Sequence, residues 1–203
     1  MTAIKRFELV SVDDYLRAEE MSPVKHEYVG GVVYAMAGGC NRHNDIAGNI
    51  YAALHSRLRG RPCRPYNSTT RIRLRLSNQV RFYYPDVSVT CHPNRPTDTF
   101  QDEPAVIVEV LSDNSRRLDE GEKRDAYLAI PTLSAYILVE QETPAAVVFA
   151  EQKMVFAVRF TKALTPSSPL GKSTPNCLWQ KCMKACHLLQ KNDHLAHRND
   201  RLR

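Results

Sequence analysis

Two carboxylates interrupt apolar stretches that otherwise have the composition of buried strands. Asp86 opens one such run and Glu109 lies inside the next. Runs rich in Val and Ile and bounded by Pro, Asn and Asp are typical of buried strands. A carboxylate buried there costs several kcal/mol of desolvation unless a positive charge meets it. If the two strands are neighbours, these acids predict a divalent-cation site.

A lysine on the following helix could supply further positive charge. Asp119, Lys123 and Tyr127 are four residues apart, so they share one face of a helix predicted over 118–130. A lysine directed at a metal–carboxylate site can bind a scissile phosphate or orient the attacking water. Alternatively, Asp119 and Lys123 form an ion pair on a solvated helix face.

The two acids also have structural interpretations. Asp86 could cap a strand after Pro85, and Glu109 could pair with an arginine, because edge strands tolerate charge. As metal ligands, however, both would suit Mg²⁺, which proteins hold with one or two carboxylates together with phosphate oxygens and water.

The remaining pattern predicts an α/β or α+β domain, a mixed sheet with helices on its faces. Residues 11–20 predict a short helix, Gly30 and Gly31 a hairpin turn, and residues 41–58 an amphipathic helix. Besides the strands of Asp86 and Glu109, further strands are predicted over residues 63–67, 70–76, 135–140 and 145–149.

The positive charge is unevenly distributed along the chain. Residues 151–203 carry 10 Lys and Arg against 3 Asp and Glu, whereas residues 1–150 carry 18 against 19. Arg71, Arg73 and Arg75 alternate with apolar residues, which predicts a strand with one cationic face. That face could contact DNA phosphates without reading sequence, or it could simply be solvated.

Taken in order, these motifs resemble the Uma-type family of restriction-endonuclease-like proteins, a branch of the PD-(D/E)XK nuclease superfamily. The segments that carry the resemblance within residues 10–150 are 26–31, 83–87, 108–112 and Asp119-x3-Lys123-x3-Tyr127. Leu111 stands where the superfamily pattern has its lysine, and in this family the lysine has moved to the following helix.

The resemblance implies a role for each of the acids. Asp86 and Glu109 are the expected metal ligands, Lys123 is the relocated catalytic lysine, and Glu27 occupies the family's early acidic position. His43 matches a recurrent family histidine, although it could also be a helix N-terminal residue without chemistry. The implied activity is hydrolysis of DNA phosphodiester bonds with Mg²⁺ or Mn²⁺, carried by a nuclease domain over residues 1–150.

Two other functions fit the same sequence. One is a catalytically inactive DNA-binding or regulatory module on the same fold, and the other is an interaction protein whose basic tail binds nucleic acid nonspecifically. Contact between Lys123 and the carboxylate pair would favour the enzyme over the inactive module. DNA is the expected partner, a homodimer is plausible, and a cytoplasmic location without membrane contact is expected.

The segment after about residue 152 differs from the rest. Cys177, Cys182 and Cys186 could bind zinc, but their spacing fits no standard ribbon or finger. A reading frame shifted by one base permits Leu-Pro-Leu-Ala-Lys-Met-Tyr-Glu-Ser-Leu over 176–186, which resembles the family's C-terminal end. The hypothesis is that a frameshift near 152–160, in the gene or its sequencing, replaced the natural C-terminus with an atypical, poorly packed tail.

Three cysteines precede that tail, at positions 40, 63 and 91. They show no paired spacing, so in a cytoplasmic chain they are predicted to be reduced and mostly structural.

Overall fold

The computed structural model describes residues 8–150 and 154–159 of the chain. Its helices are α1 (Val12–Met21), α2 (Asn41–Leu58), α3 (Arg116–Asp119) and α4 (Glu122–Leu128). Its strands are β1 (His26–Val29), β2 (Val32–Ala35), β3 (Arg64–Asn67), β4 (Arg71–Arg75), β5 (Val80–Tyr83), β6 (Val87–Thr90), β7 (Phe100–Gln101), β8 (Pro104–Val110), β9 (Ala135–Val139), β10 (Ala145–Ala150) and β11 (Met154–Arg159).

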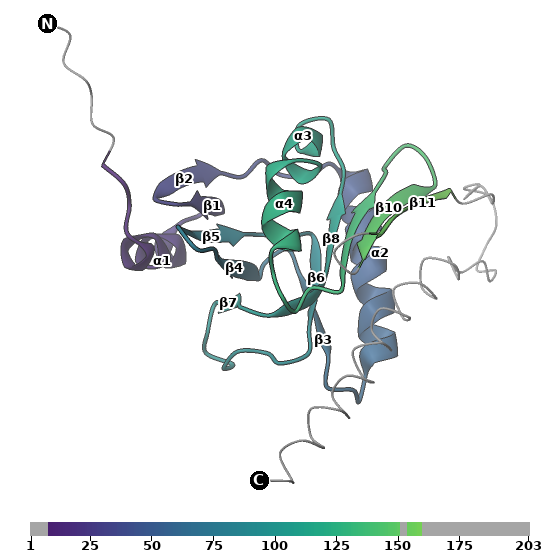
Figure 1. Cartoon of the computed structure of the whole chain (residues 1–203), viewed down its shortest axis with the longest axis horizontal. Coiled ribbons are helices and arrows are strands. Elements are labelled where there is room, and N and C mark those ends of the chain that lie inside the picture. The colour runs from purple at the N-terminus through teal and green to yellow at the C-terminus, as the bar shows by residue number, and fades with distance from the viewer. Residues whose placement is uncertain (1–7, 151–153, 160–203) are drawn as a thin grey trace, which may run out of the picture.

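The described strands form two sheets (Figure 1). The five-stranded sheet has the order β2-β1-β5-β4-β7, and the six-stranded sheet has the order β11-β10-β9-β8-β6-β3. Both are mixed, because β4 pairs parallel with β7 and β8 pairs parallel with β9. The predicted α+β class is therefore confirmed, but the strands build two sheets where the sequence suggested one.

The first helix packs on one face of the five-stranded sheet, to which the following hairpin contributes β1 and β2. Ser11 caps α1 as predicted, because its Oγ accepts a hydrogen bond of 3.1 Å from the Asp14 backbone amide. Tyr15 of α1 then packs against Tyr28 and Phe82 on one face of this sheet. The hairpin turn between β1 and β2 uses Gly30 and Gly31, both with positive φ.

α4 lies between the two sheets. Its Tyr127 contacts Tyr83 of the five-stranded sheet at a ring separation of 5.6 Å and Tyr136 of the six-stranded sheet at 5.3 Å. Ile72 and Ile107 belong to the same buried cluster, one from each sheet. The face of the five-stranded sheet that α4 covers is therefore the one opposite α1.

α2 covers the other face of the six-stranded sheet. Its Leu54 and Leu58 pack against Val108 and Val110 of β8. Because side chains alternate along a strand, Glu109 between those valines points to the opposite face, toward α4. The sheet thus separates α2 from the interior where Glu109 lies.

One predicted helix is broken in two. The sequence predicts a continuous helix over 118–130, whereas the structure has α3 and α4 with Gly121 between them. Gly121 has φ −117° and ψ −103°, which are not helical values. A Cβ added there would lie 2.8 Å from the Arg117 carbonyl oxygen, so the close turn of backbone depends on glycine.

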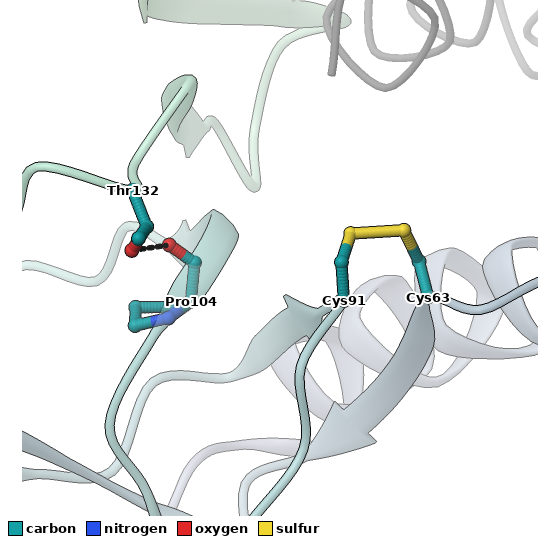
Figure 2. The surroundings of a disulfide bond; sticks show 4 residues. All are labelled: Cys63, Cys91, Pro104 and Thr132. Carbon is teal, nitrogen blue, oxygen red and sulfur yellow. Dashed lines mark hydrogen bonds between the residues drawn. A yellow bond between two sulfur atoms is a disulfide. The ribbon is translucent and has the colours of Figure 1, made fainter. Parts of the chain in front are cut away.

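The prediction of reduced cysteines is wrong for one pair. Cys63 and Cys91 form a disulfide, shown in Figure 2, while Cys40 is free and exposed. The cause is strand pairing: Arg64 of β3 lies opposite Thr90 of β6, which brings the residues just outside these strands together. A sequence separation of 28 residues hides this adjacency.

β11 pairs antiparallel with β10 and so continues the six-stranded sheet past residue 150. Most of the proposed frameshifted tail lies outside the described residues, and so do Cys177, Cys182 and Cys186, whose spacing fits no standard zinc site. Within the part of the chain that the structure describes, no helix is long and apolar enough to cross a membrane.

Candidate active site

The four predicted catalytic residues meet where the chain crosses from one sheet to the other: Glu27, Asp86, Glu109 and Lys123. Residues 84–86 connect β5 of the five-stranded sheet to β6 of the six-stranded sheet. Glu27 comes from β1, Glu109 from β8, and Asp119 and Lys123 from the α3–α4 segment. Both sheets are thus needed to assemble the site.

Lys123 lies inside a ring of carboxylates. Its Nζ atom is 2.8 Å from Glu27 Oε1, 3.5 Å from Glu109 Oε1 and 3.6 Å from Asp119 Oδ1. The lysine side chain is only 7% exposed, and that of Asp119 is 3% exposed. The alternative of an ion pair on a solvated helix face is therefore excluded by burial.

Asp86 and Glu109 lie against each other, because their strands are neighbours, the condition that the metal-site hypothesis set. β6 and β8 are antiparallel neighbours, with Val87 opposite Val108. The Asp86 backbone amide donates to Glu109 Oε2 at 3.2 Å, and the Val110 backbone amide donates to Asp86 Oδ2 at 2.7 Å. These hydrogen bonds hold both carboxylates at the same end of the β6–β8 strand pair.

Two further contacts fix the acids around the lysine. The Tyr84 backbone amide donates to Glu27 Oε1 at 3.4 Å, which ties β1 to the crossing segment. The buried Tyr127 hydroxyl donates to Glu109 Oε1 at 3.4 Å. Burial raises the pKa of Tyr127 well above its ordinary value, so this hydroxyl keeps its proton and remains a donor.

His43 contacts the site from the first turn of α2. Its Nε2 atom is 2.8 Å from Asp86 Oδ1, and both side chains are 15% exposed. The buried Nδ1 atom has no hydrogen-bond partner among the described residues. The hydrogen bond to Asp86 raises the pKa of His43, while burial opposes the increase.

The buried charges do not balance. Burial raises the pKa of Glu109 well above its ordinary value, and Lys123 only partly offsets this increase. Burial likewise raises the pKa of Asp119. Burial alone would lower the pKa of Lys123, but Glu109, Glu27 and Asp119 outweigh it and hold that pKa above its usual range. One ammonium thus faces several acids, and the excess negative charge favours the binding of protons or of a cation.

The donors fit a hard divalent cation that retains water. Among the described residues, no group of three or more His, Cys, Asp or Glu is arranged to hold a metal. Two adjacent carboxylates, Asp86 and Glu109, are nevertheless the donor set that Mg²⁺ takes when phosphate oxygens and waters complete its shell. The buried Asp119 Oδ1 faces Lys123 Nζ at 3.6 Å but accepts no hydrogen bond from the part of the chain that the structure describes, so it could receive one from such a water.

The arginines of the predicted cationic strand face are less available to DNA than the sequence suggested. Arg71 is buried, and Arg73 donates to both oxygens of Asp102 at 2.6 and 2.7 Å, which leaves Arg75 as the exposed member of this trio. Arg73 lies opposite Phe82, whose ring belongs to the α1 side of the sheet. The trio therefore lies on the face away from Lys123, and its first two members bind within the protein.

Three features of the site were not predicted from the sequence. Tyr34 of β2 lies directly opposite Glu27 and is 54% exposed, so an accessible ring stands on the same sheet face as the buried acid. The contact between His43 and Asp86 joins positions with no patterned spacing. The burial of Asp119 was not predicted either, although its spacing from Lys123 correctly placed both residues on one face of the predicted helix.

Similar proteins are known from cyanobacteria. Two uncharacterized proteins of Synechocystis sp. (strain ATCC 27184 / PCC 6803 / Kazusa) are related: slr1290 is 37% identical over 134 residues, 66% of this chain and 70% of that protein. The second, sll1609, is 28% identical over 144 residues, 70% of this chain and 80% of that protein.

A solved structure shares the fold. It is the crystal structure of a putative nuclease belonging to DUF820 from Anabaena variabilis ATCC 29413, with a TM-score of 0.59 and 16% identity over 78% of this chain and 89% of that chain. The sequence over residues 12–174 matches the Uma2 family, described as "Putative restriction endonuclease". This match and the 37% identical relative confirm the resemblance: the chain belongs to the Uma2 family.

Proposed function

We propose that this protein is a Mg²⁺- or Mn²⁺-dependent endonuclease that hydrolyses phosphodiester bonds in DNA. The observation that carries the proposal is the position of Lys123 Nζ, 2.8 Å from Glu27 and 3.5 Å from Glu109. Glu109 in turn adjoins Asp86 through a hydrogen bond of 3.2 Å. Membership of a family described as "Putative restriction endonuclease", and a fold shared with a protein titled "a putative nuclease", support nuclease-like chemistry.

The residues divide into ion-holding and phosphate-facing groups. Asp86 and Glu109 would hold the ion, which when bound lowers the pKa of a water ligand and neutralises charge on the phosphate. Lys123 then donates to a phosphate oxygen or to the attacking water, where its charge stabilises the transition state. Glu27 and Asp119 keep the ammonium protonated and in place.

The contacts of Lys123 favour this function over an inactive module. A lysine retained only for DNA contact would be expected at the surface, whereas this one is buried among acids that repel phosphate. Such a cluster suits phosphate once a divalent cation has offset the carboxylates. In the third alternative, an interaction protein, the basic tail is what binds nucleic acid. Truncation after Ala150 would then abolish DNA binding, whereas an endonuclease or an inactive DNA-binding module would keep it.

Substrate would approach along the rim formed by the β1–β2 hairpin. Tyr34 presents an exposed ring directly beside Glu27, on the same sheet face. Aromatic rings bind exposed nucleobases or sugars without regard to sequence. Tyr34 is therefore the side chain expected to contact DNA next to the reacting phosphate, in preference to the partnered Arg71 and Arg73.

Plasmid nicking tests the proposal. Purified protein is incubated with supercoiled DNA in Mg²⁺, in Mn²⁺ and in excess EDTA, alongside Asp86→Ala and the control Asp125→Ala. Asp125 is an exposed acid of α4 that pairs with Arg124. Nicking that requires the metal and is lost only in Asp86→Ala is expected. Equal nicking by the unaltered protein and Asp86→Ala would refute the assignment.

A further inference from the structure

We propose that His43 is a positioning residue that fixes the Asp86 carboxylate for metal binding. This inference rests on the proposed function, because it assigns a supporting role within the same site. Its starting point is the short contact of 2.8 Å between His43 Nε2 and Asp86 Oδ1. The resemblance to the family left this histidine without a defined role.

The two oxygens of Asp86 have different partners. Oδ2 accepts from the Val110 backbone amide at 2.7 Å, and Oδ1 meets His43 Nε2. With one oxygen bound to the β8 backbone and the other to the imidazole, the carboxylate cannot rotate without breaking one of these bonds. Its remaining lone pairs are thereby presented in one orientation. Supporting hydrogen bonds of this kind orient ligands in metal sites.

The surroundings of His43 are shaped for this ring position. The imidazole is largely buried, and its contact with Asp86 joins the first turn of α2 to the start of β6. A Cβ added to Gly39 would come within 2.7 Å of the His43 ring, so the loop before α2 leaves room for the imidazole only because residue 39 is glycine. Gly39 has no positive φ, so this requirement is one of space.

The orientation also specifies which histidine atom matters. Nε2 is the atom that faces Asp86, whereas the buried Nδ1 finds no hydrogen-bond partner within residues 8–150 and 154–159. With Nε2 as donor, this hydrogen bond uses one lone pair of Asp86 and leaves the carboxylate's other lone pairs to face a cation. A glutamine at this position can extend an amide donor to about the place of Nε2, whereas leucine fills similar volume with no donor. The pair of substitutions therefore separates hydrogen bonding from packing.

The test is Mn²⁺ affinity of the full chain without DNA, measured by calorimetry and by the electron paramagnetic resonance signal of free Mn²⁺. His43→Leu is expected to weaken binding roughly 10- to 100-fold, the usual cost of removing a supporting hydrogen bond. His43→Gln should restore most of the affinity. Gly39→Ala, which displaces the ring without altering it, should weaken binding as His43→Leu does. The control His55→Leu changes an exposed histidine of the same helix and should have no effect.

The outcomes separate this inference from the proposed function. Saturable binding that His43→Leu leaves unchanged would overturn the positioning role alone. Equal losses in His43→Leu and His43→Gln would also overturn it, because the donor at Nε2 would then not be the cause. An unaltered protein that binds no Mn²⁺ would overturn the proposed function and this inference together. Thermal unfolding in EDTA establishes that each variant is folded.

Discussion

The ammonium of Lys123 lies 2.8 Å from the Oε1 atom of Glu27, although the two residues belong to a helix and to the first strand. Glu27 occupies β1 of the five-stranded sheet, and the other acid near this lysine, Glu109, occupies β8 of the six-stranded sheet. Lys123 thus connects the two sheets electrostatically at the point where the chain crosses between them. This cation is expected to matter for both folding and chemistry.

Replacing Lys123 by Met should strongly destabilise the protein. The substitution leaves Glu27, Glu109 and Asp119 buried without their cation, and breaking a buried pair in this way costs about 3–5 kcal/mol. Urea unfolding at pH 7 in EDTA measures the loss. Arg124→Met, at the next position of α4, removes a partly exposed cation and should cost less than about 0.5 kcal/mol. Similar losses in both variants would contradict the buried cluster.

The protonation of Glu109 should make the stability of the protein depend on pH. Its pKa is raised on folding, mainly by burial, so above about pH 4.3 the folded state holds a proton that the unfolded state has released. Stability of the metal-free protein should therefore fall as pH rises through this window toward the raised folded pKa. Glu109→Gln should flatten that decline, whereas Glu142→Gln, at a 78% exposed side chain, should not. Denaturant unfolding between pH 5 and 8 distinguishes them.

Much of the local structure was predictable because its causes are local. The cap at Ser11, the glycine hairpin and the alternation around Glu109 all act within a few residues, and each element appears where the pattern indicated. The metal-site hypothesis required the strands of Asp86 and Glu109 to be neighbours, and β6 does pair with β8. The division into two sheets depends on long-range packing of α4, which no short pattern encodes.

The parts of the site that escaped prediction depend on partners distant in sequence. Arg73 has a pattern typical of a solvated strand, yet it forms an ion pair with Asp102, which lies between β7 and β8. His43 meets Asp86 only because α2 covers β6. The disulfide likewise follows from the register of β3 and β6. Each case is a contact between two helices, strands or loops that are distant in sequence. The tertiary packing that brings them together cannot be predicted from the spacing of residues along the chain.

Tyr34 should contribute to DNA binding, and its neighbour Val33 should not. Tyr34 shares a sheet face with Glu27, while Val33 pairs with Tyr28 on the face covered by α1. Loss of one stacking ring costs about 1–3 kcal/mol, so Tyr34→Ser should weaken binding roughly fivefold to hundredfold. Tyr34→Phe should retain most of the affinity. Fluorescence anisotropy of a labelled oligonucleotide in Ca²⁺ is the measurement, and equal effects of Tyr34→Ser and Val33→Ser would count against this approach path.

The disulfide should stabilise the edge formed by β3 and β6. The disulfide closes a loop with a sequence separation of 28 residues. This lowers the conformational entropy of the unfolded chain and so stabilises the folded protein by about 3–4 kcal/mol. The double variant Cys63→Ala, Cys91→Ala should show this loss in urea unfolding without reductant, and Cys40→Ala should behave as the unaltered protein. Added dithiothreitol should bring the unaltered protein to the stability of the double variant. If reductant changes neither protein, the bridge does not form in solution.

The most direct test of the proposed site is the rate of plasmid nicking in Mg²⁺ by Lys123→Met, assayed at a temperature where circular dichroism shows the variant folded. Loss of a cation that stabilises the transition state predicts a rate at least roughly 100-fold below that of the unaltered protein, with Arg124→Met unaffected. A folded Lys123→Met protein that nicks DNA at the unaltered rate would contradict the assignment of Lys123 to catalysis.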